Sequence, residues 1–251
     1  MKQRLVSDLK DGFILSCQAL PNEPLHGSRI MAAMAAAAEE GGAAAIRANT
    51  PEDIREIKRR CSLPVIGLYK KQYEDSDVYI TPTIVEVRDI VEASAEFVAV
   101  DCTRLPRPGN QTLDDLIREI RCAFPQILIV ADVSTYEEGV HAISLGVDIV
   151  STTMSGYTPH SPQQDGPDLE LVGNLSRLGK VPVLAEGRLW SIEQCLSSFD
   201  IGAHAVVVGT AITRPQEIVK RYVQRIRKEE TATKNERYYP IFHEERDYCE
   251  H

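Results

Sequence analysis

About eight short apolar runs recur in this 251-residue sequence at a spacing typical of a barrel of strands and helices, and nearly every run ends in a polar or charged residue. If these runs are parallel strands closed into a barrel, their carboxyl ends meet on one face, where such barrels carry their active sites. The residues at these ends are therefore the first candidates for chemistry. In chain order they are Gln18, Arg47, Lys70, Asp101, Asp132, Thr152, Glu186 and Gly209.

Lys70 and Glu186 are the candidates for proton transfer. Lys70 ends an otherwise apolar run, so partial loss of hydration would lower its pKa and make it a base or a Schiff-base nucleophile. The structural alternative is a lysine that extends to solvent or pairs with an acid, which is our interpretation of Lys71. Glu186 is a candidate acid or base, with an ion pair to Arg47 or Arg188 as its alternative.

Two glycines predict a phosphate site. Gly187 and Gly209 follow the last two predicted strands, where barrels of this kind offer backbone N–H groups and the start of a short helix to a phosphate. Arg214 would add a charge-assisted contact. The alternative is that each glycine only allows a tight turn.

The remaining polar ends suit a sugar. Gln18 and Arg47 offer an amide and a guanidinium to a carbonyl or hydroxyl-rich ligand. Asp101 and Asp132 could orient Lys70, bind sugar hydroxyls or cap the loops that follow them, and Asp132 is the stronger candidate for a site role. Together these groups indicate proton-transfer chemistry on a phosphorylated sugar, without a metal or nucleotide fingerprint.

The elements that must position these residues alternate regularly. Such alternation predicts a parallel sheet, and the length suits an α/β TIM (β/α)8 barrel of eight parallel strands in a single domain over residues 1–228. We expect a charged C-terminal extension over 229–251, with mobility as one option. Strands are predicted at 13–17, 43–46, 64–69, 97–100, 127–131, 147–150, 182–185 and 205–208, and helices at 28–40, from Thr50 onward, 85–92, 113–123, 135–145 and 169–178.

Two long loops, 71–81 and 155–167, lie on the predicted active face. The second has the composition of a lid, and a passive loop fits it equally well. His160 lies in this loop and is interpreted as a surface residue rather than a catalyst.

Composition narrows the partners. A net charge of −9 argues against nucleic acid, which normally calls for a basic face. No run of about 18 apolar residues and no signal peptide is found, so we expect a cytoplasmic protein without a membrane segment. The six cysteines are scattered without the close pairs of zinc or redox sites, and we interpret them as mostly buried thiols. We therefore expect no metal and no cofactor.

Several segments together resemble a known family. The stretch STTMSGYTP at 151–159 is the most specific of them; the others are SCQAL at 16–20, GAAAIR at 42–47, YITPT at 79–83, AEG at 185–187 and TRP at 213–215. They resemble the N-acetylmannosamine-6-phosphate 2-epimerase family of bacterial sialic acid catabolism. The resemblance runs from about residue 15 to about residue 225 and does not include the extension after Lys228.

This resemblance implies a TIM barrel that interconverts N-acetylmannosamine 6-phosphate and N-acetylglucosamine 6-phosphate without a metal, an isomerase of the N-acylglucosamine-6-phosphate 2-epimerase type. It implies a small-molecule sugar phosphate as the partner, with a homodimer as one option. By position, the resemblance assigns Lys70 and Glu186 as catalytic, Gln18, Arg47 and Asp132 as substrate-binding, and Gly187, Gly209 and Arg214 as phosphate contacts.

The expected reaction suits these residue types. A proton at C2 becomes acidic only beside a carbonyl, so the sugar ring must first open to the C1 aldehyde. Our hypothesis is that Glu186 assists ring opening and Lys70 transfers the C2 proton, with Arg47 or Gln18 stabilising the enolate oxygen.

Two other functions remain open from the residues alone. One is a different sugar-phosphate barrel enzyme that uses Lys70 as a Schiff-base nucleophile, as an aldolase-type lyase or a synthase would. The other is a catalytically silent sugar-phosphate sensor on the same scaffold. The presence of both Lys70 and Glu186 weighs against a sensor.

Overall fold

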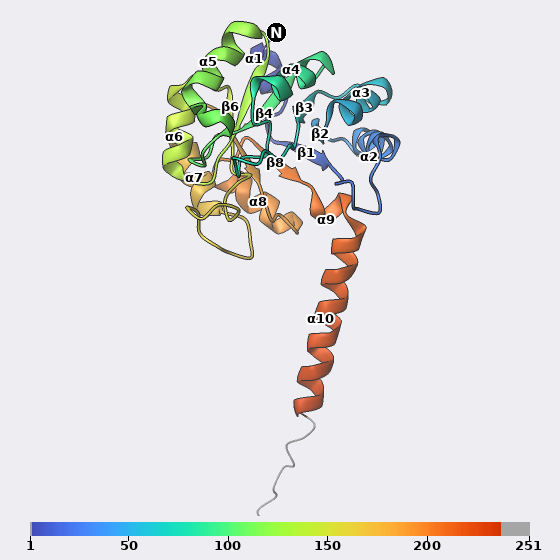
Figure 1. Cartoon of the computed structure of the whole chain (residues 1–251). Coiled ribbons are helices and arrows are strands. Elements are labelled where there is room, and N and C mark those ends of the chain that lie inside the picture. Colours follow the sequence, from blue (N-terminus) through green and yellow to red (C-terminus); the bar gives the residue numbers. More distant parts are fainter. Residues whose placement is uncertain (1, 237–251) are drawn as a thin grey trace, which may run out of the picture.

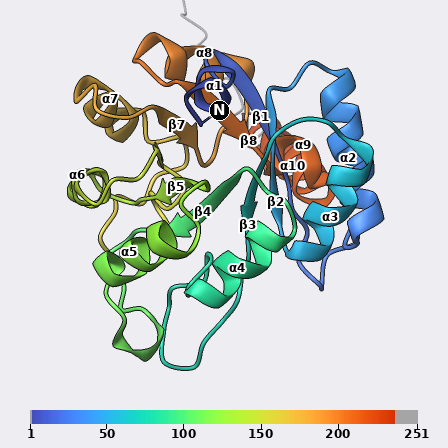
Figure 2. The same cartoon turned by 90° about the horizontal axis from the view of Figure 1, so that it is seen from above.

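The computed structural model describes residues 2–236, which form a closed barrel of eight parallel strands in sequential order, with β8 pairing back to β1. Figure 2 shows the helices as a ring around the strands. The predicted eight-stranded parallel barrel is thus confirmed. The strands are β1 Gly12–Cys17, β2 Ala45–Asn49, β3 Val65–Leu68, β4 Phe97–Asp101, β5 Leu128–Asp132, β6 Ile149–Ser151, β7 Val183–Glu186 and β8 Ala205–Val208.

Strand β2 differs from its prediction in a way that matters for the site. It was expected to end before Arg47, but it continues to Asn49, because Asn49 still pairs with Leu68 of β3. The prediction that Arg47 stands at a strand end is therefore wrong. Arg47 lies in the middle of β2, in register with Ser16 and Ile66, so its side chain starts deep in the barrel.

The helices follow the predicted alternation closely. Two of them, α2 and α5, have the predicted bounds, and the side chain of Thr50 accepts a hydrogen bond at the start of α3, as an N-cap does. Helices α1, α8 and α10 were not assigned from the sequence, and α9 was expected only as a short helix after the last strand. The helices are α1 Lys2–Ser7, α2 Ser28–Glu40, α3 Pro51–Arg60, α4 Ile84–Glu92, α5 Leu113–Ala123, α6 Tyr136–Ser144, α7 Leu169–Arg177, α8 Ile192–Asp200, α9 Thr210–Thr213 and α10 Pro215–Glu236.

The apolar core has two parts, as the barrel geometry requires. One fills the barrel interior and includes Ile66, Phe97 and Val207; the other lies between the strands and the surrounding helices. Arg47 is the largest side chain in the described residues that is completely buried. A charge at that depth needs partners, because removing an unpaired charge from water is very costly.

Helix α10 leaves the barrel. Figure 1 shows it projecting away from the carboxyl-end face, well beyond the other helices. It passes residue 228, where the sequence predicts the end of the barrel domain, and residues 237–251 of the predicted extension lie outside the described residues. In the described part of the chain, no helix is both long and apolar enough to cross a membrane.

Candidate functional site

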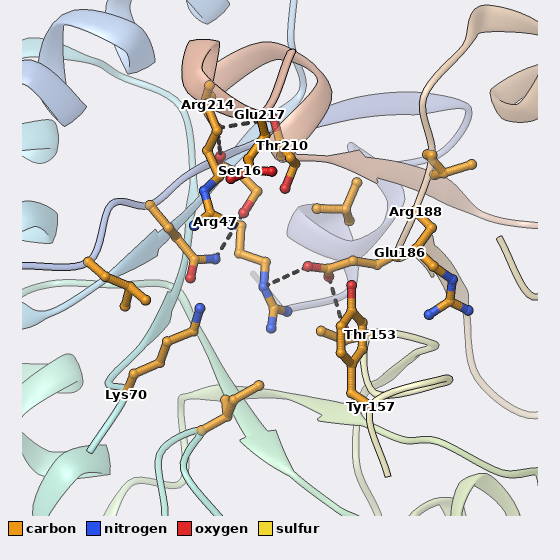
Figure 3. Close-up of a pocket in the computed structure, with 18 of the residues that line it drawn as sticks. Ser16, Arg47, Lys70, Thr153, Tyr157, Glu186, Arg188, Thr210, Arg214 and Glu217 are labelled. Carbon is orange, nitrogen blue, oxygen red and sulfur yellow. Dashed lines mark hydrogen bonds and ion pairs between the residues drawn. The ribbon is translucent and has the colours of Figure 1, made fainter. Parts of the chain in front are cut away.

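A cavity of about 430 Å³ opens at the carboxyl ends of the strands (Figure 3). All but one of the residues that sequence reasoning assigned to the site line this cavity. Asp132 is the exception, because it is completely buried behind Arg47. The predicted residues that line the cavity are Gln18, Arg47, Lys70, Glu186, Gly187, Gly209 and Arg214.

Arg47 organises the deep part of the cavity. Its Nη1 and Nη2 donate to the two carboxylate oxygens of Asp132, over 3.1 and 2.6 Å, in the paired geometry that favours arginine over lysine. Its Nε lies 3.2 Å from Glu186 Oε1. Burial alone would lower the pKa of Arg47, but the charges of Asp132 and Glu186 raise it above its usual value. Arg47 therefore remains a fixed positive charge.

Glu186, the last residue of β7, is held on its other oxygen by hydroxyl groups. Its Oε2 lies 3.0 Å from Thr153 Oγ1 and 3.2 Å from Ser151 Oγ. Burial raises the pKa of Glu186; the positive charge of Arg47 opposes this rise, and the negative charge of Asp132 adds to it. The ion pair with Arg47, one of the two structural alternatives for Glu186, is thus present, and it still leaves Glu186 lining the cavity.

Lys70 lies across the cavity from Glu186, two residues beyond the end of β3. Its backbone N–H donates to Asn49 Oδ1 over 2.8 Å, which fixes the chain where the lysine emerges. Burial, and then the positive charge of Arg47, lower the pKa of Lys70 to about 8. Among residues 2–227, whose side chains the structure describes, no salt bridge holds the Lys70 amino group. Lys71 Nζ instead pairs with Glu86 over 3.2 Å, as the sequence interpretation of Lys71 predicted.

We call Arg47, Asp132, Thr153 and Glu186 the inner end of the site. Sequence reasoning missed Thr153 and its neighbour Ser151. The signal was present, because both belong to the STTMSGYTP segment and alternate residues of an extended chain point to the same side. Only Thr152 was considered there, and its hydroxyl instead bonds the backbone N–H and carbonyl of Glu186.

The outer end of the site consists of Glu23, Gly187, Gly209 and Arg214. Gly187 adopts a φ of +106°, which favours glycine, and a Cβ on Gly209 would come within 3.2 Å of the Ser16 Cβ. Gly209 precedes the short helix α9, as the phosphate-site prediction requires.

Arg214 has a protein partner at this outer end. Its Nη2 donates to Glu23 Oε1, and Gln216 Nε2 donates to the same oxygen over 3.3 Å. The side chain of Glu23 is 10% exposed and that of Arg214 is 33% exposed. Glu23 was not predicted, because it lies in the loop after β1 and no spacing in the sequence connects it with Arg214.

Several polar atoms that line the cavity lack a protein hydrogen bond. Gln18 Nε2 donates to Ser16 Oγ over 2.9 Å, but Gln18 Oε1 is buried without a partner. Arg214 Nε is also buried without a hydrogen bond, whereas Arg47 Nε has the ion-pair contact with Glu186 Oε1. Buried polar groups normally have partners, so Gln18 Oε1 and Arg214 Nε mark positions where a polar ligand would be stabilised.

Asp101 and His160 have structural surroundings. The Asp101 Oδ1 atom accepts hydrogen bonds from the backbone N–H and the hydroxyl of Thr103, over 2.9 and 2.7 Å, and thereby caps the loop after β4. Burial raises the pKa of Asp101 to about 6. His160 is exposed in the long loop after β6, as predicted.

Arg188 holds that long loop against the site. Its Nε donates to the Gly166 carbonyl over 2.7 Å, and its Nη1 donates to the Ser155 carbonyl. The guanidinium also stacks on the ring of Tyr157, 5.5 Å from the ring centre, and Tyr157 lines the cavity. Arg188 therefore binds the loop, and Arg47 is the arginine that pairs with Glu186.

Metal-ligating groups do not gather in the described part of the chain. Among residues 2–227, whose side chains the structure describes, there is no set of three or more His, Cys, Asp or Glu side chains that could hold a metal ion. Of the cysteines in this part, Cys17, Cys61 and Cys102 are buried as expected, Cys195 is partly buried and Cys122 is exposed.

Comparison with solved structures matches both fold and sequence. The structure of the N-acetylmannosamine-6-phosphate 2-epimerase from Clostridium perfringens is 47% identical, with a TM-score of 0.85, and the match covers 88% of this chain and 95% of that one. QR15, described as an aldolase, matches with a TM-score of 0.59 over 87% of this chain and 97% of its own. At 19% identity it shows the barrel fold alone.

Sequence relatives agree with this match. A protein of Caldanaerobacter subterraneus subsp. tengcongensis, named "Putative N-acetylmannosamine-6-phosphate 2-epimerase", is 53% identical over 89% of this chain and 94% of its own. A relative of the same name from Clostridium perfringens strain SM101 is 49% identical over 85% of this chain and 96% of its own. The model of the family described as "Putative N-acetylmannosamine-6-phosphate epimerase" matches residues 31–228. This chain therefore belongs to the N-acetylmannosamine-6-phosphate epimerase family.

Proposed function

We propose that this chain interconverts N-acetylmannosamine 6-phosphate and N-acetylglucosamine 6-phosphate, which makes it an N-acylglucosamine-6-phosphate 2-epimerase. The observation that carries the proposal is the pairing of two proton-transfer groups in one cavity. Lys70, with its pKa lowered to about 8, and Glu186, with its pKa raised by burial, line the cavity together with the cationic Arg47. Acid and base groups with shifted pKa values are typical of sites that move protons near neutral pH.

Ring opening is assigned to Glu186. The Glu186 carboxylate accepts the proton of the anomeric hydroxyl as the C1–O5 bond breaks, and the resulting acid donates that proton to O5. The step leaves an aldehyde at C1 and a hydroxyl at C5, with no net gain or loss of protons. One carboxyl group suffices because both oxygens belong to the same end of the sugar ring.

Proton transfer at C2 is assigned to Lys70. Its neutral amine accepts the C2 proton, and the electron pair of the C–H bond moves to form an enolate whose negative charge is on O1. A proton then returns from the Lys70 ammonium to the opposite face of C2, once that face has turned toward it, which gives the epimer, restores the aldehyde and regenerates the neutral amine. The ring closes by the reverse of the opening step. Arg47, fixed by Asp132, or Gln18 stabilises the enolate oxygen.

The rest of the site positions the substrate. Gly187, Gly209 and Arg214 bind the 6-phosphate, with Arg214 supplying the charge. Gln18 binds the sugar through its Oε1, which is buried and has no protein partner. A sugar hydroxyl donates a hydrogen bond to this oxygen. Asp132 contributes through Arg47, because its carboxylate is completely buried and both of its oxygens accept from that guanidinium.

An NMR time course with N-acetylmannosamine 6-phosphate tests the function. We expect signals of N-acetylglucosamine 6-phosphate to grow without an added metal or cofactor, to the same equilibrium mixture from either epimer. Cleavage of the sugar into two fragments, together with borohydride trapping of substrate on Lys70, would show a Schiff-base lyase instead. Calorimetric binding without turnover would show a sensor.

We propose a homodimer in which α10 contributes to the interface. Val219, Tyr222, Val223 and Ile226 are exposed on this projecting helix, and their spacing of three and four residues places them on one face. An apolar helix face is normally covered in a soluble protein. Light scattering coupled to gel filtration should give the dimer mass, and Tyr222→Asp should give the monomer mass. A monomer mass for the unaltered chain would contradict the proposal.

The cytoplasmic location remains a prediction from the sequence.

A further inference from the structure

We propose that Thr153 is a positioning residue whose hydroxyl connects Asp132 with Glu186 and so allows the Glu186 carboxyl to gain and lose a proton without moving. The inference rests on the proposed function, in which Glu186 opens the sugar ring. Thr153 follows β6 by two residues, and Figure 3 shows it next to the Glu186 carboxyl.

The geometry around Thr153 Oγ1 is that of a bridge. The atom lies 2.8 Å from Asp132 Oδ1, 3.0 Å from Glu186 Oε2 and 2.8 Å from Ser151 Oγ. Ser151 Oγ is itself 3.2 Å from Glu186 Oε2. These distances lie within or close to the range of hydrogen bonds between oxygens. One hydroxyl therefore contacts both carboxyl groups of the inner end.

Counting protons shows what the bridge can do. Each hydroxyl carries one proton and an ionised carboxylate carries none, so Ser151 and Thr153 together can make at most two of these four contacts into hydrogen bonds. A proton on Glu186 Oε2 adds a third donor. Glu186 then donates to Thr153, and Thr153 donates to Asp132, while Thr153 can still accept from Ser151.

The same atoms thus suit both protonation states of Glu186. With Glu186 ionised, the Thr153 hydroxyl turns toward Oε2 and donates to it, while Asp132 keeps its two bonds from Arg47. With Glu186 protonated, the hydroxyl turns toward Asp132. Turning a hydroxyl moves no heavy atom, so the carboxyl stays in place for the sugar.

The charges that face Glu186 come from three other strands or their ends. Arg47 of β2 lies 3.2 Å from Oε1, Asp132 of β5 lies behind Arg47, and Lys70 extends from beyond β3. Tyr79 is also close enough to interact with Arg47 and Asp132. The positive charge of Arg47 acts on Glu186 Oε1, whereas Glu186 Oε2 is contacted by the hydroxyls of Ser151 and Thr153. Removing the Thr153 hydroxyl should therefore disfavour the ionised form of Glu186.

Thr153→Val tests the link because it removes the hydroxyl and nearly preserves the shape. We expect the pKa of Glu186 to rise by about one unit, because the ionised carboxylate loses a charge-assisted hydrogen bond from the hydroxyl, whereas the acid loses a weaker one to a neutral oxygen. The value is read from the carboxyl carbon in ¹³C NMR of glutamate-labelled protein, with Glu186→Gln to assign the signal. We also expect kcat to fall about tenfold and KM to change less than about threefold.

Two variants separate positioning from packing. Thr153→Ser restores the hydroxyl and should recover most of kcat and the original pKa of Glu186. Thr158→Val removes another buried hydroxyl of the same segment, one that bonds Ser134 and is close to Ser161, and should change neither quantity. If Thr153→Val shows no cooperative melting transition, Thr153→Ala replaces it in every measurement.

The outcomes distinguish this inference from the proposed function. An unchanged pKa of Glu186 in Thr153→Val overturns the link, and so does a loss of kcat that Thr153→Ser fails to restore. Lack of epimerisation by the unaltered chain overturns the proposed function instead. A shifted pKa in Thr153→Val would support the link even then, because the titration needs no substrate.

Discussion

The two ends of the site differ in how deeply their charged side chains are buried and in how those side chains are paired. At the inner end, the side chains of Arg47 and Asp132 are completely buried and pair with each other through two hydrogen bonds. At the outer end, Arg214 is 33% exposed and pairs with a glutamate that a phosphate would compete with. In the proposed function, the inner end is therefore set before substrate arrives, whereas Arg214 at the outer end would exchange a protein anion for the substrate phosphate.

This difference suits the two tasks. Stabilising an enolate depends on charges that need no rearrangement during the reaction, and burial in a low-dielectric interior strengthens them. Binding a phosphate calls for release as well as capture, and the Glu23 carboxylate would limit how tightly Arg214 holds the phosphate in the proposed function. Substitutions at the inner end should thus affect stability and kcat, and those at the outer end should affect KM.

The largest effect is expected at Lys70. Lys70→Met removes the proposed C2 base, and kcat should fall by about 10³-fold, within the range that a positioned acid or base contributes. Lys71→Met is the matched control, because Lys71 is half-exposed and pairs with Glu86 away from the proposed chemistry. It should keep kcat within about twofold, because Lys71 does not line the cavity. Near-full turnover by Lys70→Met would contradict the assignment.

Stability should separate the two arginines. Arg47→Met leaves Asp132 and Glu186 buried near each other without their cation, which should lower the free energy of unfolding by about 3–5 kcal/mol. Arg214→Met removes a partly exposed pair and should cost at most about 1 kcal/mol. Urea unfolding measures both values. Equal losses of unfolding free energy in the two variants would contradict the expectation that the buried Arg47 ion pairs stabilise the fold more than the Arg214 pair.

Activity should rise with pH around the pKa of Lys70. Only the neutral amine accepts the C2 proton, and burial followed by the charge of Arg47 lowers this pKa to about 8. The value of kcat/KM should thus increase about tenfold from pH 7 to pH 9, as the ammonium form is lost. The measurement is a profile of initial rates at constant ionic strength. A profile that is flat over this range would remove Lys70 from the role of base.

The smallest effect is expected at Glu23. Glu23→Gln keeps the size of the side chain but removes the charge that competes for Arg214, so KM should fall about threefold while kcat stays unchanged. Arg214→Met should raise KM instead. A higher KM in Glu23→Gln would indicate that Glu23 positions Arg214 for phosphate rather than competing with it.

The barrel and several residues that line the cavity could be predicted from the sequence for a physical reason. Apolar runs, caps such as Thr50 and strand-end residues such as Glu186 are local features, and closure of the barrel brings those ends together. The site contacts could not be predicted in the same way, because they join residues that no spacing connects. Arg47 with Asp132 and Arg214 with Glu23 are such pairs, 85 and 191 positions apart.

Strand-end position also proved incomplete as a guide. Arg47 reaches the cavity from the middle of β2, and Asp101, at the end of β4, caps a loop instead. Thr153 lies beyond the end of β6 yet contacts both buried carboxyl groups. In each case the partner decides the role, and partners are fixed by register and burial rather than by place in a strand.

Transfer of the C2 proton is tested most directly by the epimerisation of N-acetylmannosamine 6-phosphate in deuterated water, followed by NMR. We predict that the N-acetylglucosamine 6-phosphate formed carries deuterium at C2, and that Lys70→Met loses both the conversion and the exchange at C2. Conversion without deuterium at C2, or exchange at the normal rate in Lys70→Met, would contradict proton transfer by Lys70.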